Sequence, residues 1–330
     1  MILLTRPDCI RIGNVDLMLP VFFPSVSSVK TGLPPLDYVR LLSTLGSINK
    51  QFLVSAFDLH GAKDEEQEEL ERLLANARST GPVVVMDSGN YESFWKSAQS
   101  RWTQADYHSA LKQFPCAMAF GYDEQQPPGD HDTHKRLVLD RWRQDQATTV
   151  SVPIIPIVHG NPKRLPKLCV DIAGESGIHM IAVPERRLGS GIYERTQTVA
   201  EIRRVLDGLG RYVGLHLLGT GNPISIAIYS LAGADSYDGL EWCQTVVDYE
   251  SALLFHLSQG DFFRAQSGWG DEEISFLSRV LAHNLEFYAD WMTRLRRAIH
   301  TGNGIEFCRT NFPQRIFNQC FSMLGWEERA

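Results

Sequence analysis

The chain has 330 residues, of which 43% are hydrophobic, and a formal net charge of −7. No run approaches the roughly 18 apolar residues of a membrane span, and the net charge argues against coating nucleic acid by bulk charge, although a local basic groove is compatible with it. The six cysteines are scattered, and the N-terminus, with Arg6, Pro7 and Asp8, does not resemble a secretion signal. We therefore expect a cytoplasmic protein with free thiols and no membrane contact.

The first predicted element is a β-hairpin over Ile10–Leu19, because Gly13-Asn14 at its centre is a good tight-turn dipeptide. Short apolar runs then alternate with amphipathic stretches. The runs predicted as strands are Val21–Val26, Gln51–Phe57, Val83–Asp87, Cys116–Phe120, Ile154–His159, His179–Pro184, Tyr212–Leu218 and Ala234–Asp238. The stretches predicted as helices include Glu68–Ala77, Leu137–Gln146, Thr196–Leu209 and Pro223–Leu231.

Continuous apolar strands that alternate with helices are typical of parallel strands covered on both faces. About eight such units over roughly 250 residues match a (β/α)8 barrel. The predicted fold class is therefore α/β, a TIM barrel with an N-terminal hairpin at its bottom, and an open doubly wound sheet is the alternative. After about residue 248 the pattern becomes all-helical, with its longest stretch at Glu272–Ala298.

No linker rich in proline, glycine or serine separates the hairpin, the barrel and the helical extension. We expect one domain over residues 1–330, with the hairpin in 1–20, the barrel core in 21–247 and a C-terminal helical extension in 248–330. Active sites of barrels lie at the C-terminal ends of the strands, so the residues that follow the strands are the candidates for chemistry.

Two aspartates, Asp87 and Asp238, stand at the ends of predicted strands and lie close to glycines. Asp123 and the pair His159-Gly160 follow two other strands, so carboxylates and a histidine are expected at one face of the barrel. A helix N-cap is the structural alternative for Asp123. The two aspartates suggest a nucleophile and an acid/base that act on one bond.

Several motifs resemble those of the tRNA-guanine transglycosylases. Asp87–Glu92 resembles their Asp-Ser-Gly-Gly-(Phe/Tyr)-Gln motif, His216–Pro223 their His-x-x-Gly-x-Gly-x-Pro turn, and Gly233–Asp238 their nucleophile motif. The segments that resemble their first strand and late helix are Leu19–Pro24 with Val29-Lys30, and Ala282–Tyr288 followed by Leu295–Ile299. These matches follow the order of the family.

The resemblance implies a glycosyltransferase that exchanges guanine for a 7-deazaguanine base in nucleic acid. Asp238 matches the nucleophile that attacks C1′ and forms a covalent intermediate, and Asp87 matches the general acid/base for the purine proton. The residue types suit this chemistry, because a carboxylate stabilises and traps an oxocarbenium-like carbon and a leaving purine needs a proton.

The resemblance also implies a pocket for the base. Tyr91 matches an aromatic that stacks on the base, Asp123 a carboxylate that reads the N1–H and 2-amino edge, and Ser88 belongs to the same motif. His159-Gly160 stands where the family has Gln-Gly, so His159 is expected to replace that glutamine as a partner of the base. Packing roles are the alternative for Tyr91 and His159.

The chain departs from the family in its metal ligands. His283 stands at the position of the family's zinc histidine, but the upstream stretch Ser251–Gly270 contains no cysteine. Because structural zinc needs about four ligands, we predict no zinc and no other cofactor. Asn90 and Glu92 replace a glycine and a glutamine, and Ile181–Arg187 replaces a Gly-Gly-Leu segment, so selectivity for the incoming base is open.

The missing zinc ligands weaken the case for tRNA as the substrate. The chain resembles relatives that insert 7-deazaguanines into DNA about as well as it resembles the tRNA enzymes, so DNA is slightly favoured. The residues expected at the nucleic-acid backbone, with solvated surface charge as their alternative, are Lys163, Arg164, Lys167, Arg186 and Arg187. The alternatives are an enzyme of small deazapurine nucleosides and a catalytically silent partner subunit that binds nucleic acid. A homodimer or a partner protein is left open.

Overall fold

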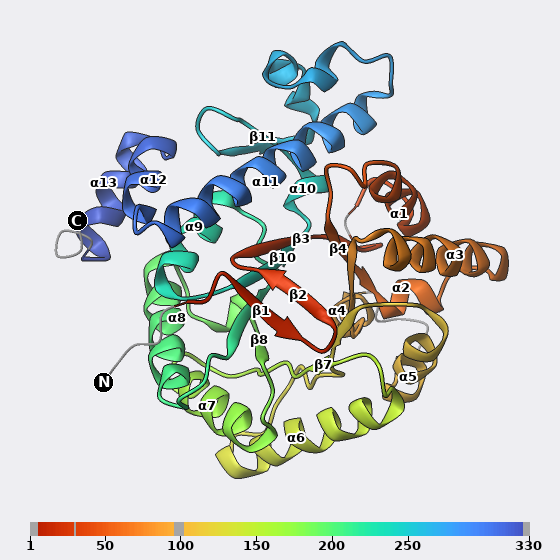
Figure 1. Ribbon diagram of the computed structural model, residues 1–330, viewed down its shortest axis with the longest axis vertical. Helices are drawn as coiled ribbons and strands as arrows, with labels where there is room; N and C mark the ends of the chain where they lie inside the picture. The colour runs from red at the N-terminus through yellow and green to blue at the C-terminus, as the bar shows by residue number, and fades with distance from the viewer. Residues whose placement is uncertain (1–5, 30, 96–101, 326–330) are drawn as a thin grey trace.

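The computed structural model describes residues 6–29, 31–95 and 102–325, so Lys30 of the first-strand resemblance lies outside the described residues. An eight-stranded parallel sheet in the order β7-β6-β5-β4-β3-β10-β9-β8 curls into a barrel (Figure 1). Its strands are β3 Val21–Val26, β4 Gln51–Ser55, β5 Val83–Asp87, β6 Met118–Phe120, β7 Ile154–Ile155, β8 Met180–Pro184, β9 Gly214–Leu218 and β10 Ser236–Gly239. The predicted barrel is confirmed.

Helices surround this barrel on its outside (Figure 1). They are α1 Pro35–Thr44, α2 Ala56–His60, α3 Asp64–Thr80, α4 Asn90–Trp95, α5 Gln104–Gln113, α6 His131–Thr148, α7 Leu165–Ser176, α8 Ile192–Asp207, α9 Pro223–Ala232 and α10 Glu241–Gln244, with the 3₁₀ turn η1 Glu185–Arg187 after β8. The helices cover the outer face of the barrel, so its strands are buried on both faces. This is why the strands are continuous apolar runs in the sequence.

The barrel closes between β7 and β8 through a single parallel bridge, Ile157 with Ala182. Proline lacks the N–H that a ladder needs, so Pro156 ends β7 at Ile155, well before the predicted end at His159. The Val158 N–H donates to the Ala182 carbonyl at 2.8 Å and continues the closure. The strand predicted over Gln51–Phe57 is also shorter in the structure, because α2 begins at Ala56.

The predicted hairpin is confirmed as β1 Cys9–Ile12 and β2 Val15–Met18, joined at Gly13-Asn14. Its buried side chains, among them Ile12 and Leu17, pack with residues that fill the barrel interior. Gly13 has φ +59°, and a Cβ there would lie 2.9 Å from the side chain of Pro153, just before β7, so the turn needs glycine. The hairpin thus covers the N-terminal end of the barrel and leaves the other end for the site.

The prediction that the part after residue 248 is all-helical is wrong. A short strand and two 3₁₀ segments precede the helices there. The strand pairs antiparallel with one that ends at Val247, across a turn in which the Asp248 carboxylate accepts the Glu250 N–H. The elements are β11 Thr245–Val247, β12 Leu254–His256, η2 Leu257–Gln266, η3 Gly268–Asp271, α11 Phe276–His300, α12 Gly304–Asn311 and α13 Gln314–Met323. Helix α11 packs against β3, where Tyr288 stacks on Phe22 at 4.5 Å.

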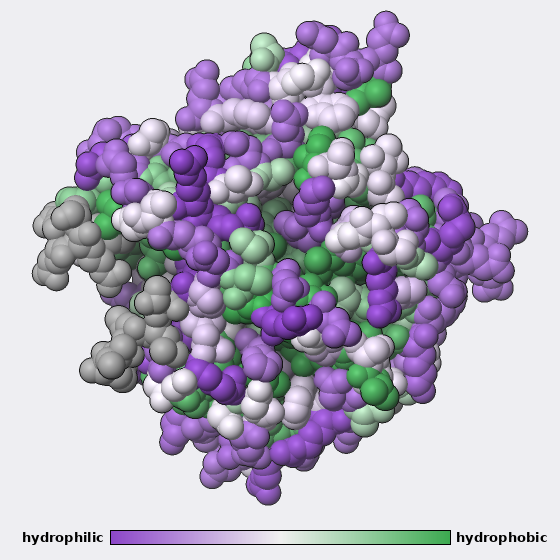
Figure 2. Space-filling model, in the orientation of Figure 1, coloured by the Kyte–Doolittle hydropathy of each residue, from purple (hydrophilic) through white to green (hydrophobic). Residues whose placement is uncertain are grey.

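The face that carries the hairpin is shown in Figure 2. A cleft of about 400 Å³ lies between β2, the start of β4 and α11, and Met18, Asn49 and Met292 are among its lining residues. The six cysteines are free, as predicted. None of the helices in the described ranges is long and apolar enough to cross a bilayer.

Candidate active site

The candidate side chains lie at the C-terminal end of the barrel, opposite the hairpin. Asp87 ends β5, Asp238 is the next-to-last residue of β10, and Asp123 and His159 follow β6 and β7. The turn after β5 requires Gly89, because its φ is +80° and a Cβ there would lie 2.6 Å from the backbone nitrogen of Phe57. This close approach fixes where Asp87 and the start of α4 lie.

The Asp238 carboxylate is held by three donors. Its Oδ1 accepts hydrogen bonds from His216 Nε2 at 3.1 Å and from the Gly219 N–H at 3.0 Å, and its Oδ2 accepts one from Ser25 Oγ at 2.9 Å. His216 and Ser25 belong to the two strands that flank β10, and the other ring nitrogen of His216 contacts Ser236 Oγ at 2.7 Å. The carboxylate is therefore oriented at the barrel mouth, and Oδ2 keeps lone-pair capacity for an incoming group.

The surroundings of Asp87 favour its protonated form. Its Oδ2 accepts the Gly89 N–H at 3.1 Å, which favours the charged form. Burial outweighs this bond and, together with the charges of Glu92, Asp123 and Asp238, raises the pKa of Asp87 well above the ordinary aspartate value. The charge of Asp238 thus favours the protonated form of Asp87.

Asp123 is buried and surrounded by donors. Its Oδ1 accepts from Ser88 Oγ at 3.1 Å and Asn90 Nδ2 at 2.9 Å, and its Oδ2 contacts His159 Nε2 at 2.6 Å. Gln125 Nε2 donates a further bond to Oδ2. Burial by itself raises the pKa of Asp123, but the bonds from His159, Asn90 and Ser88 outweigh it, so the pKa lies below the ordinary value and the carboxylate stays ionised.

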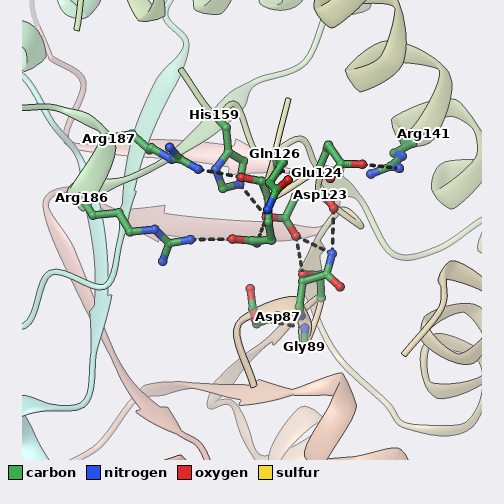
Figure 3. A network of polar contacts seen from close by, with 12 residues as sticks. Asp87, Gly89, Asp123, Glu124, Gln126, Arg141, His159, Arg186 and Arg187 are labelled. Atoms are coloured by element: carbon green, nitrogen blue, oxygen red, sulfur yellow. Dashed lines mark hydrogen bonds and ion pairs between the residues drawn. The ribbon is translucent and has the colours of Figure 1, made fainter. Parts of the chain in front are cut away.

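Two arginines reach this cluster from the end of β8 (Figure 3). Arg186 donates to Gln125 Oε1 at 2.6 Å, and Arg187 donates to the Gln125 carbonyl at 2.7 Å. Arg186 also lies over the ring of Tyr91, 6.0 Å from its centre. Both guanidinium groups thus have partners within the chain, and their contact with nucleic acid stays a prediction.

The other predicted rim residues differ in their surroundings. Arg164 donates to the carbonyls of Pro128 and Asp130, both at 3.3 Å, whereas Lys163 and Lys167 are exposed. Gly160 packs beneath α7, where a Cβ would lie 3.2 Å from the Leu165 side chain, and this contact concerns packing, not the base. The base-binding roles of Gly160 and Tyr91 remain predictions.

Several residues of the site were not predicted as such. His216 belongs to the turn motif His216–Pro223, and Asn90 is a departure from the motif Asp87–Glu92, but neither was predicted to hold a carboxylate. The sequence offered no signal for Ser25 and Gln125, because their roles depend on contacts between separate loops. Burial raises the pKa of Glu241 to about 7, and its carboxyl group lies near Asp238.

The residues around His283 do not fit a zinc site. His283 Nε2 contacts the Val247 carbonyl at 2.8 Å and its Nδ1 contacts Ser267 Oγ at 3.0 Å. Within residues 6–29, 31–95 and 102–325, no three His, Cys, Asp or Glu side chains come together as a metal-ligand set. His283 therefore joins β11 and η3 to α11 through hydrogen bonds.

The arrangement combines an oriented carboxylate, a carboxyl group that retains a proton and an ionised carboxylate that accepts N–H donors. Such a set can attack carbon, protonate a leaving group and recognise a donor edge. A comparison with models of protein families found no match, and a comparison with characterised proteins found none either. The family resemblance therefore rests on the motifs themselves.

Proposed function

We propose that this protein is a guanine transglycosylase that exchanges guanine for a 7-deazaguanine base in nucleic acid, with DNA ahead of tRNA. The observation that carries the proposal is the pairing of Asp238, oriented by three donors, with Asp87, whose pKa is raised, at one barrel mouth. The motifs that resemble the transglycosylases support the same pair. A guanosine in a polymer must leave its stack to reach this site.

In the first displacement, Asp238 Oδ2 attacks C1′ and the bond from C1′ to the purine breaks. The electron pair of that bond goes to guanine, which takes the proton from Asp87. Ser25, His216 and Gly219 hold the attacking carboxylate in place, so little reorganisation is needed. A covalent sugar ester on Asp238 and a deprotonated Asp87 result.

In the second displacement, the incoming base attacks C1′ from the face that guanine left. Its nitrogen forms the new bond, its proton goes to the Asp87 carboxylate, and Asp238 leaves as a carboxylate. The configuration at C1′ is retained because two inversions occur, as in retaining glycosidases. Both carboxyl groups return to their starting states, so no further reactant is required.

The preference for DNA comes from the sequence. The family's zinc subdomain docks tRNA, and Ser251–Gly270 has none of its cysteines. This segment forms β12, η2 and the start of η3 instead. We therefore favour DNA, which would bind without a zinc subdomain.

A small deazapurine nucleoside is the second candidate substrate. The intramolecular contacts of Arg164, Arg186 and Arg187 favour it, because guanidinium groups with protein partners are less available to phosphates. The two candidates share the chemistry of Asp87 and Asp238 and differ in what carries the sugar.

The test supplies labelled guanine together with duplex DNA, single-stranded DNA, tRNA or free guanosine. Label in DNA supports the proposal, and label only in tRNA or only in guanosine selects the corresponding alternative. Binding of a polymer without any incorporation would instead identify a silent partner subunit.

We predict that Asp238→Asn lowers base exchange at least about a thousandfold, because the nucleophile is removed. The variant also loses the covalent adduct that wild type forms with labelled polymer on a denaturing gel. Asp16→Asn, which changes an exposed aspartate of the hairpin, keeps wild-type exchange and serves as the control. Full activity of Asp238→Asn would contradict the mechanism.

A further inference from the structure

Gln125 uses hydrogen-bonding capacity that a ligand of Asp123 would need. Each carboxylate oxygen has about two acceptor sites. Ser88 and Asn90 donate to Oδ1, and His159 and Gln125 contact Oδ2. All four sites are therefore in use in this structure, and a ligand that donates to Asp123 has to replace one of these donors.

Gln125 is the donor best able to leave. Ser88, Asn90 and His159 are buried, with 1%, 9% and 1% of their surface exposed. Gln125 is only partly buried and lies in the connection between β6 and α6, which has no helix or strand. Moving its side chain outward breaks its bond to Asp123 and the bond that Arg186 donates to its amide oxygen, and neither Gln125 nor Arg186 is a buried residue.

The opposite side of Gln125 is held by the arginines of η1. Arg186 donates to the amide oxygen and Arg187 donates to the backbone carbonyl, while the amide nitrogen of Gln125 donates to Asp123. Arg186 in turn lies over Tyr91, the residue expected to stack on the base. One chain of contacts therefore links the stacking residue, Arg186, Gln125 and Asp123.

We propose that the Gln125 amide is an internal stand-in for the donor edge of the base, exchanged for that edge when the base binds. The inference rests on the proposed function, which supplies a base with N1–H and 2-amino donors. A base without such donors offers the buried Asp123 charge nothing in place of the amide, so it binds with Gln125 still on Asp123. Gln125 thus competes for Asp123 only with a donor-bearing base, whose affinity it lowers.

The experiment measures the affinity of free guanine and of unsubstituted purine, which lacks the 2-amino and N1–H donors, by equilibrium dialysis. Gln125→Leu removes the competing donor, and we expect it to lower the Kd for guanine by about tenfold or more while the Kd for purine stays unchanged. Gln126→Leu is the matched control, because Gln126 is the exposed neighbour in the same segment, and it leaves both Kd values unchanged.

A second variant separates the loss of the donor from a change in folding or from the extra space that a shorter side chain leaves. Gln125→Glu keeps the size of the side chain, has no donor when ionised and is repelled by Asp123, so it also strengthens guanine binding. Unchanged or weaker guanine binding in both variants overturns the inference, and so does an equal gain for purine, which would reflect added space alone.

Failure of the proposed function is separable from failure of this inference. Labelled-guanine exchange is measured on the same protein preparations. If wild type binds guanine but incorporates none into DNA, tRNA or guanosine, the transglycosylase proposal fails, and the Kd comparison still decides the role of Gln125. If neither wild type nor variants bind guanine, the exchange of donors is overturned as well.

Discussion

Glu92 lies in α4 and is buried, with only 4% of the residue exposed. Its Oε1 accepts a hydrogen bond from Ser27 Oγ at 2.7 Å. Burial, together with the charge of Asp58, raises the pKa of Glu92 from 4.5 to about 7. Glu92 is therefore protonated in the folded protein over a pH range in which it is ionised in the unfolded chain.

This difference predicts how stability depends on pH. Between about 4.5 and about 7, the folded state binds more protons at Glu92 than the unfolded state, so the free energy of unfolding falls as pH rises. The contribution is complete below pH 4.5 and is lost as pH rises through about 7. We expect Glu92→Gln, which keeps a neutral acceptor, to exceed wild type in stability by roughly 1 to 3 kcal/mol at pH 8.

The measurement is urea denaturation of wild type and Glu92→Gln at pH 4.5, 6 and 8. The difference in unfolding free energy should grow with pH and be small at the lowest value. A constant difference across this range would show that the carboxyl group of Glu92 does not change its protonation between the two states.

At the scale of elements, the N-terminal hairpin closes the end of the barrel opposite the site. Ile12 and Leu17 are each 3% exposed and pack with residues of the barrel interior, whereas Arg11, between Ile10 and Ile12, points to solvent. This alternation along β1 places every second side chain in the core. The hairpin therefore stabilises the barrel from the end opposite the site.

Ile12→Ala should lower the free energy of unfolding by about 2 to 4 kcal/mol, because a buried side chain is truncated and a cavity remains. Arg11→Ala, its neighbour on the exposed face, should change it by less than about 0.5 kcal/mol. Chemical denaturation at one pH gives both values. Equal effects of the two substitutions would contradict the packing of the hairpin beneath the barrel.

At the scale of the whole molecule, cations are distributed unevenly around the site. The three arginines predicted to contact a polymer all have intramolecular partners, whereas Lys163 and Lys167 are exposed at the end of the barrel that carries the site. Phosphate contacts release counterions, so they appear in the salt dependence of binding. The two lysines are the cations most available for such contacts.

We expect the double variant Lys163→Ala/Lys167→Ala to bind DNA more weakly and to reduce the slope of log K against log salt by about one per lost contact. Binding of free guanine should not change, because neither lysine contacts Asp123. Lys50→Ala removes an exposed lysine just before β4, at the hairpin end of the barrel, and should leave DNA binding unaltered. An unchanged slope in the double variant would place the polymer elsewhere.

The sequence by itself determined the order of the elements, the barrel, the hairpin turn and the position of Asp87 and Asp238 at strand ends. These features depend on local signals, namely the apolar runs, the alternation of strands with helices and the glycine-containing turns. Strand ends were less well predicted where a proline such as Pro156 intervened. The short strand β12 was missed because its pairing depends on a turn at Asp248.

Only the tertiary structure decided what each polar group contacts. Asp235 and Asp238 lie in one motif, but Asp235 binds Arg6 at 2.8 Å and Tyr212 at 2.6 Å, whereas Asp238 lies at the mouth. A strand rises about 3.3 Å per residue, so three positions separate the two carboxylates by about 10 Å along the barrel. The donors around Asp123 come from loops that are distant in sequence, and folding alone brings them together.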